Sequence, residues 1–184
     1  LAAAAAHRGG VTSVDAVSVG SSSLVCSGGY DGAVGLWDCG DDGELRQLLR
    51  FKPGGGAIFS VVIRQIDDDA ALLTCGSFER RVTAWYLSGV GTAAAAPAPR
   101  QLWVTPQHTG WVRALAIAPR RRSSVRPHAV YSVGCNRING WAAGVAAADL
   151  ANAARRPLED GLVDRVLPMT DRQCELVVKE DEVR

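Results

Sequence analysis

The sequence has 184 residues, of which 47% are hydrophobic and 21% are charged. This length is enough for one globular domain, and the composition is too apolar for a disordered chain. The formal net charge of +1 gives no general attraction to nucleic acid, anionic membranes or acidic substrates, so any such partner would need a local patch.

The cysteines and histidines form no recognisable framework for a metal or for disulfides. The five cysteines are odd in number, widely spaced and free of any C-x-x-C pair, which argues against a zinc module and fits a reducing compartment. The three histidines lie far apart, without i, i+4 spacing. We therefore expect neither a metal nor another cofactor. The residues concerned are Cys26, Cys39, Cys75, Cys135, Cys174, His7, His108 and His128.

The start of the chain carries no recognisable targeting signal. The segment from Leu1 to Ala6 is rich in alanine and lacks a basic stretch followed by an apolar core. No apolar run reaches the ~18 residues that a membrane-spanning helix needs. We expect a soluble protein inside the cell, in the cytoplasm or nucleus by default. Organelle targeting stays open, because we expect the true N-terminus to be missing.

In chain order, the first unit covers residues 1–50. It contains an alternating apolar strand around Val11 and Val14, a second strand at Leu24–Ser27, a tight turn, and a third strand that ends at Trp37. An outer strand follows at Glu44–Arg50. Four short strands of this kind are the sequence signature of a propeller blade.

The second unit, residues 51–105, repeats the first with an offset of 48 residues between Trp37 and Trp85. Its strands are expected around Ile58, at Leu72–Cys75, up to Trp85 and at Arg100–Thr105. The low-complexity stretch Thr92–Pro99 is expected to be a flexible surface loop between the third and fourth strands.

The third unit, residues 106–156, aligns if one residue is deleted from its turn. Its strands are expected around Val112 and Leu115, at Val130–Val133 and up to Trp141. Beyond it the pattern weakens: residues 146–156 look helical or loop-like, and residues 162–169 and 174–179 are possible strands. Residues 157–184 are the possible start of a further blade.

The segment from His7 to Trp37-Asp38 resembles a WD repeat, and the resemblance covers roughly residues 7–141. In that family a hydrogen-bonded chain runs from the Trp indole through a hydroxyl and an imidazole to an aspartate in the turn. The resemblance implies that His7, Ser27, Asp31 and Trp37 form this chain. The residue types suit it, because indole donates, hydroxyl and imidazole both donate and accept, and carboxylate accepts. The expected role of these residues is structural, not catalytic.

The other two units depart from this pattern. The second has Gly54, Cys75 and Glu79 in place of the histidine, serine and aspartate. We therefore expect its polar chain to be absent and the unit to be held mainly by apolar packing. The apolar residues concerned are Ile58, Val61, Leu72, Val82 and Trp85. The third unit keeps a partial chain of His108, Ser132 and Trp141, with Asn136 in place of the acid.

The expected fold class is all-β. We expect a partial β-propeller of about three four-stranded antiparallel blades, with an irregular C-terminal region. Known propellers use ~4 to 8 blades, so the remaining blades are expected from a missing part of the chain.

The expected function is a non-catalytic scaffold that binds peptides or domains of other proteins on one face. Aromatic and arginine side chains anchor such contacts. The candidate partner-binding residues are Tyr30, Phe78, Arg80, Arg81, Trp111 and Arg137. One alternative is a propeller-based enzyme with its site in the central channel. Another is nucleic-acid binding through the loop Arg120–Arg126, which we expect on the opposite face together with Asp67–Asp69.

Overall fold

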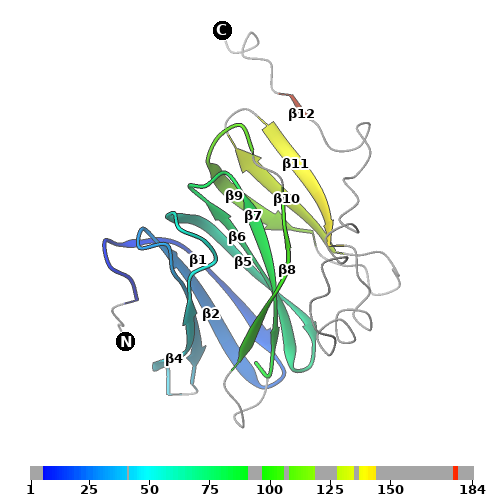
Figure 1. Ribbon diagram of the computed structural model, residues 1–184. Coiled ribbons are helices and arrows are strands. Elements are labelled where there is room, and N and C mark those ends of the chain that lie inside the picture. Colours follow the sequence, from blue (N-terminus) through cyan, green and yellow to red (C-terminus); the bar gives the residue numbers. More distant parts are fainter. Residues whose placement is uncertain are drawn as a thin grey trace, which may run out of the picture.

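The computed structural model describes residues 6–40, 42–90, 97–105, 108–118, 128–134, 137–143 and 176–177 (Figure 1). The regular elements in these ranges are all β-strands, arranged in three antiparallel sheets of four strands. Within the same ranges there is no helix that is long and apolar enough to cross a membrane. The expectation of an all-β fold built from four-stranded antiparallel sheets is therefore confirmed.

The first sheet has the order β1-β2-β3-β4, drawn in blue to cyan in Figure 1. Its strands are β1 (Val11–Val19), β2 (Ser22–Gly29), β3 (Val34–Cys39) and β4 (Leu45–Phe51). The expectation that the third strand ends at Trp37 was wrong. Asp38 and Cys39 continue β3 because they still pair with Leu24 and Ser23 of β2.

The second sheet has the order β5-β6-β7-β8. Its strands are β5 (Ile58–Asp67), β6 (Ala70–Ser77), β7 (Val82–Ser88) and β8 (Ala98–Val104). The expectation of a surface loop over Thr92–Pro99 is wrong at its end, because Ala98 and Pro99 begin β8. They pair with Ser88 and Leu87. A proline is tolerated there because β8 is the edge strand, where one side of the backbone needs no ladder hydrogen bond.

The third sheet has the order β9-β10-β11-β12. Its strands are β9 (Val112–Ile117), β10 (His128–Gly134), β11 (Arg137–Ala143) and the short β12 (Leu176–Val177), which pairs with the start of β11. The interpretations of residues 146–156 and 162–169, and of the arginines at 120–126, fall outside the described residues.

The second sheet lies between the other two, and apolar side chains fill both interfaces. Successive residues of a strand point to opposite faces. Val61 and Ile63 of β5 therefore enter the cluster shared with the first sheet, whereas Val62 enters the cluster shared with the third. The leading residues of the first cluster include Leu24, Leu36, Ile58 and Leu73, and those of the second include Leu72, Val82, Val112 and Ile117.

Serine hydroxyls join the first strands of neighbouring sheets. The backbone N–H of Val61 donates to Ser13 Oγ at 3.2 Å, and that of Leu115 donates to Ser60 Oγ at 3.1 Å. Ser13 and Ser60 occupy equivalent positions of the first and second units, so the same contact is made twice. These hydrogen bonds therefore fix how far the first strand of one sheet is shifted along the first strand of the next.

Two glycines let the sheets approach closely. A Cβ atom at Gly28 of β2 would lie 2.7 Å from Ile58 Cγ2, and one at Gly76 of β6 would lie 2.6 Å from Val112 Cγ1. Both distances are far below van der Waals contact. The second strand of each sheet therefore needs glycine where the first strand of the next sheet packs against it.

A β-bulge recurs at one position near the start of the first strand of each sheet. The register shifts at Thr12 in β1, at Phe59 in β5 and at Arg113 in β9. A bulge leaves one residue unpaired and re-aims its side chain. These three residues are therefore released from the strict alternation that orients their neighbours.

Candidate functional site

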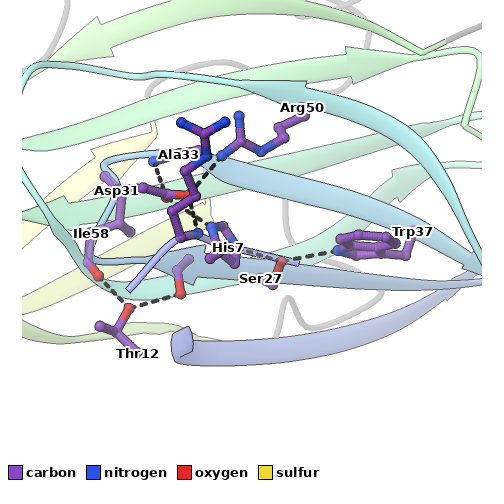
Figure 2. Close-up of polar contacts among 10 residues, drawn as sticks. His7, Thr12, Ser27, Asp31, Ala33, Trp37, Arg50 and Ile58 are labelled. Atoms are coloured by element: carbon purple, nitrogen blue, oxygen red, sulfur yellow. Dashed lines mark hydrogen bonds and ion pairs between the residues drawn. The ribbon is translucent and has the colours of Figure 1, made fainter. Parts of the chain in front are cut away.

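His7, Ser27, Asp31 and Trp37 form one continuous hydrogen-bonded chain in the first sheet (Figure 2). Trp37 Nε1 donates to Ser27 Oγ at 3.0 Å, and Ser27 Oγ lies 2.9 Å from His7 Nε2. His7 Nδ1 lies 2.9 Å from Asp31 Oδ1. The consistent assignment has Ser27 donating to Nε2 and Nδ1–H donating to the carboxylate, because the indole already occupies a lone pair of the hydroxyl.

Asp31 is the most heavily bonded group of the chain. Its two oxygens also accept the backbone N–H groups of Arg8, at 2.8 Å, and Ala33, at 3.0 Å, and the Arg50 guanidinium at 2.7 Å. Partial burial opposes ionisation, but the hydrogen bonds from His7, Arg8 and Ala33 outweigh it and hold the pKa of Asp31 well below its ordinary value. A carboxylate held in this way is a structural acceptor and a poor general base at neutral pH.

The second sheet uses other polar contacts in place of this chain. Trp85 Nε1 donates to Thr83 Oγ1 at 3.1 Å, and the longer Glu79 reaches the backbone N–H of Gly55 at 2.8 Å. The unit was expected to be held mainly by apolar packing, and these polar contacts add to that packing. Apolar packing is nevertheless extensive, because Ile58, Leu72 and Val82 are fully buried.

The third sheet retains the histidine end of the chain. His108 Nε2 lies 2.9 Å from Ser132 Oγ, and Asn139 Nδ2 lies 3.4 Å from His108 Nδ1. Burial of the ring lowers the pKa of His108. Asn136 and the side chain of Trp141 lie outside the described residues.

The turns between the second and third strands share one geometry in the first two sheets. Gly32 has φ +73° and Arg80, at the equivalent position, has φ +64°. The amides of Gly32 and Arg80 donate to the carbonyls of Gly29 and Ser77 at 3.1 and 3.2 Å, respectively. The turn fixes the adjacent aromatic residue, Tyr30 or Phe78, at the end of the sheet.

The two turns, the bulge of β5 and the residue before β9 bring four aromatic side chains into one aromatic cluster at this end of the three sheets. Phe59 is at its centre, with ring centroids 6.4 Å from Tyr30, 6.4 Å from Phe78 and 5.8 Å from Trp111. Phe78 and Trp111 are 4.9 Å apart. Tyr30, Phe78 and Trp111 are 60%, 48% and 41% exposed, which is unusual for large aromatic residues and marks a candidate contact surface. We call this end of the sheets the aromatic end.

Arginine side chains surround the aromatic cluster. The Arg113 guanidinium lies 4.8 Å from the ring centre of Trp111 and 5.3 Å from that of Phe59, within cation–π range. Beside it is an open depression of about 710 Å³. The depression is lined by Phe78, Glu79, Arg80, Arg81, Thr109, Gly110 and Trp111.

The structure brings together most of the expected partner-binding residues. Tyr30, Phe78 and Trp111 belong to the aromatic cluster, and Arg80 and Arg81 line the depression. Arg137 begins β11, where it pairs with Gly134 of β10, and its side chain lies outside the described set. Phe59 and Arg113 were missed, because their positions depend on the bulges.

Two of the cysteines are unsuited to nucleophilic chemistry. Burial raises the pKa of Cys75 to about 12, against a smaller lowering by its hydrogen bond to Thr83. Burial, followed by the nearby charge of Asp15, also raises the pKa of Cys26. Both thiols therefore stay protonated at neutral pH. In the part of the chain that the structure describes, no three His, Cys, Asp or Glu side chains are grouped to hold a metal ion.

A comparison with protein-family models found no match to this chain. A search of curated proteins likewise found no relative.

Proposed function

We propose that this chain is a section of a WD-repeat β-propeller whose sheets are its blades, and that it acts as a non-catalytic scaffold for other proteins. Four-stranded antiparallel sheets stacked through their first strands support this assignment, as does the chain of Trp37, Ser27, His7 and Asp31. The remaining blades would come from further parts of the protein.

The observation that carries the binding role is the aromatic cluster. Rings from three sheets meet on one surface, where Tyr30, Phe78 and Trp111 stay exposed although the sheets have apolar interfaces that bury other large side chains. Exposed aromatic residues beside arginine are the side chains that most often anchor protein interfaces. The contact surface would be continuous across the three sheets, because Phe59 of the second sheet touches rings of the other two.

A structural role for the ionisable groups supports a scaffold over an enzyme. His7 and Asp31 are each committed to several hydrogen bonds within the sheet framework. An enzyme in a central channel would need a carboxylate or imidazole free to meet substrate.

Affinity purification with the full-length protein tests the proposal. The double variant Arg81→Ala/Trp111→Ala should lose bound proteins by a factor corresponding to ~1–2 kcal/mol or more, without unfolding. The matched control is Asp67→Asn/Asp68→Asn at the opposite end of the second sheet, which should retain them. Equal loss from both variants, or loss from the control alone, would move the contact surface to the other end.

A further inference from the structure

We infer that the partner segment bound at the aromatic end is acidic and carries a large apolar side chain. The carboxylates of the segment would pair with Arg81 and Arg113, while its apolar side chain would enter the depression beside Phe78 and Trp111. This inference rests on the proposed function and specifies the chemistry of the partner.

The first argument is the separation of charge between the two ends of the sheets. Among the described residues, the aromatic end carries six basic side chains against two acidic ones. The basic residues are Arg8, Arg50, Lys52, Arg80, Arg81 and Arg113, and the acidic residues are Asp31 and Glu79. The net charge of +1 for the whole chain hides this local excess.

Both acids at the aromatic end are already engaged. Asp31 accepts bonds from His7, Arg50 and two backbone amides, and Glu79 accepts the amide of Gly55. Arg81 and Arg113 are exposed, and within the described part of the chain neither is within 4.0 Å of a carboxylate oxygen. Their charges are therefore available to a partner.

The opposite end has the reverse character. The turn between β5 and β6 exposes Asp67, Asp68 and Asp69, and the connection before β4 exposes Asp42 and Glu44. Two described basic residues lie near this end: Arg46, which is paired with Asp42 at 2.7 Å, and Arg100, at the equivalent position of β8. The acidic side chains at this end still outnumber them. An acidic segment would thus be attracted to the aromatic end and repelled from the other, which gives the encounter a direction.

The shape of the cluster favours a peptide side chain over a nucleic-acid base. Single-stranded nucleic acids stack their bases on open ring faces. Here the Arg113 guanidinium lies over the rings of Phe59 and Trp111, and Phe78 packs against Trp111 with an interplanar angle of 31°. The open space lies beside the rings, where Phe78 and Trp111 line the depression together with polar residues that include Arg81 and Thr109.

Selection from a displayed library of random short peptides tests this inference. The bait is the full-length protein, and peptides that still bind Trp111→Ala are removed. We expect the remaining peptides to be enriched in Asp and Glu beside Leu, Phe or Trp. Their affinity should fall about threefold to tenfold in Arg81→Gln and should weaken with added salt. The matched control, Arg46→Gln at the opposite end, should bind them unchanged.

Charge exchange gives a second readout that a misfolded variant cannot imitate. Arg81→Glu should reject an acidic peptide and regain binding when one carboxylate of that peptide is replaced by lysine. If the Trp111-dependent peptides are neutral or basic, the inference is wrong while the proposed function stands. If no selected peptide depends on Trp111, both are wrong.

Two other occupants would also overturn the inference. An oligothymidylate that binds more tightly than any selected peptide and depends on Trp111 would assign the surface to nucleic acid. Salt-sensitive self-association that is abolished by Asp67→Asn/Asp68→Asn would assign it to the acidic turn of a second copy.

Discussion

Gly29 lies so close to the imidazole of His7 that a Cβ atom at position 29 would overlap Cγ and Nδ1 of the ring. The same relationship recurs in the third sheet, where a Cβ atom at Gly134 would lie 2.8 Å from His108 Nδ1. The second unit has neither partner: Ser77 stands in place of the glycine and Gly54 in place of the histidine. Histidine and glycine therefore occupy these two positions as a pair.

This pairing predicts strong coupling between positions 7 and 29. Gly29→Ala should lower the free energy of unfolding by about 1–3 kcal/mol through overpacking. The double variant His7→Gly/Gly29→Ala should be no less stable than His7→Gly alone, since the clash is gone. Urea unfolding of the four proteins in the cycle measures this, and additive losses would contradict it.

The left-handed conformation of Arg80 predicts a stabilising substitution. Arg80 has φ +64°, where Gly32 stands in the first sheet. A side chain in this region costs ~1–2 kcal/mol, part of which is offset by the greater freedom of glycine in the unfolded chain. Arg80→Gly should therefore raise the melting temperature relative to Arg80→Ala, which removes the same side-chain contacts without relieving the backbone. A lower melting temperature for Arg80→Gly than for Arg80→Ala would refute the prediction.

Val14 and Val61 form a matched pair for testing the stacking of the sheets. They occupy equivalent positions in β1 and β5, yet Val14 is 64% exposed and Val61 is 2% exposed. Val61→Ser should cost about 2–4 kcal/mol, because it removes packing and buries a hydroxyl, whereas Val14→Ser should change the stability by less than about 0.5 kcal/mol. Chemical denaturation checks both. A similar cost at both positions would mean that the outer face of β1 is covered in solution.

The lowered pKa values of His108 and Asp31 predict two acid-sensitive windows. Burial lowers the folded-state pKa of His108, so its neutral ring stabilises the fold fully above pH ~6.5, and this contribution is lost as the pH falls below that value. The pKa of Asp31 is also lowered, so its contribution is present above pH ~3.9 and is lost below it.

Unfolding free energies measured across pH separate the two groups. His108→Gln should be less stable than the wild type at neutral pH and should show a weaker decline between pH ~7.5 and ~5.5. Asp31→Asn should flatten the decline below pH ~4. If the pH dependence of the unfolding free energy is unchanged in a variant, the substituted residue does not cause the acid sensitivity in that range.

Repetition made the strand content predictable from the sequence. The alternating apolar residues and the recurring Trp placed the strands around Leu24, Leu72 and Val130, all of which lie in second strands. The ends of the strands were harder to predict, because they depend on pairing with a neighbouring strand. Asp38 extends β3 through its partner Leu24, and nothing in the local sequence indicates this.

The polar contacts of the second sheet could have been found from the sequence. Thr83 is two residues before Trp85, so both side chains point to the same face of β7, and its hydroxyl can replace that of the missing serine. Glu79 has one more methylene group than aspartate, and opposite glycines it reaches a backbone amide directly. Both contacts were missed because the second unit was compared with the first one position at a time, by residue type alone.

The aromatic cluster could be predicted only in part from the sequence. The alignment of the units places Tyr30 and Phe78 in equivalent turns, and the alternation of strand direction brings Trp111 to the same end. Phe59 and Arg113 have no such signal. In a regular strand they would alternate with their neighbours, and a register shift is visible only once the strands are paired.

The bulges at Thr12, Phe59 and Arg113 place three different side chains at one equivalent position of the three units. A hydroxyl, a ring and a guanidinium occupy the same site of successive units, while the neighbouring residues keep the sheets in register. The Thr12 hydroxyl donates to the carbonyls of Gly28 and Ile58 and so joins the first two sheets, whereas Phe59 and Arg113 belong to the exposed end. If this end binds a partner as proposed, exchanging Phe59 or Arg113 should alter what it recognises. For engineering, the bulge positions of the second and third units could therefore be substituted separately to change the side chain that this end of the sheets presents.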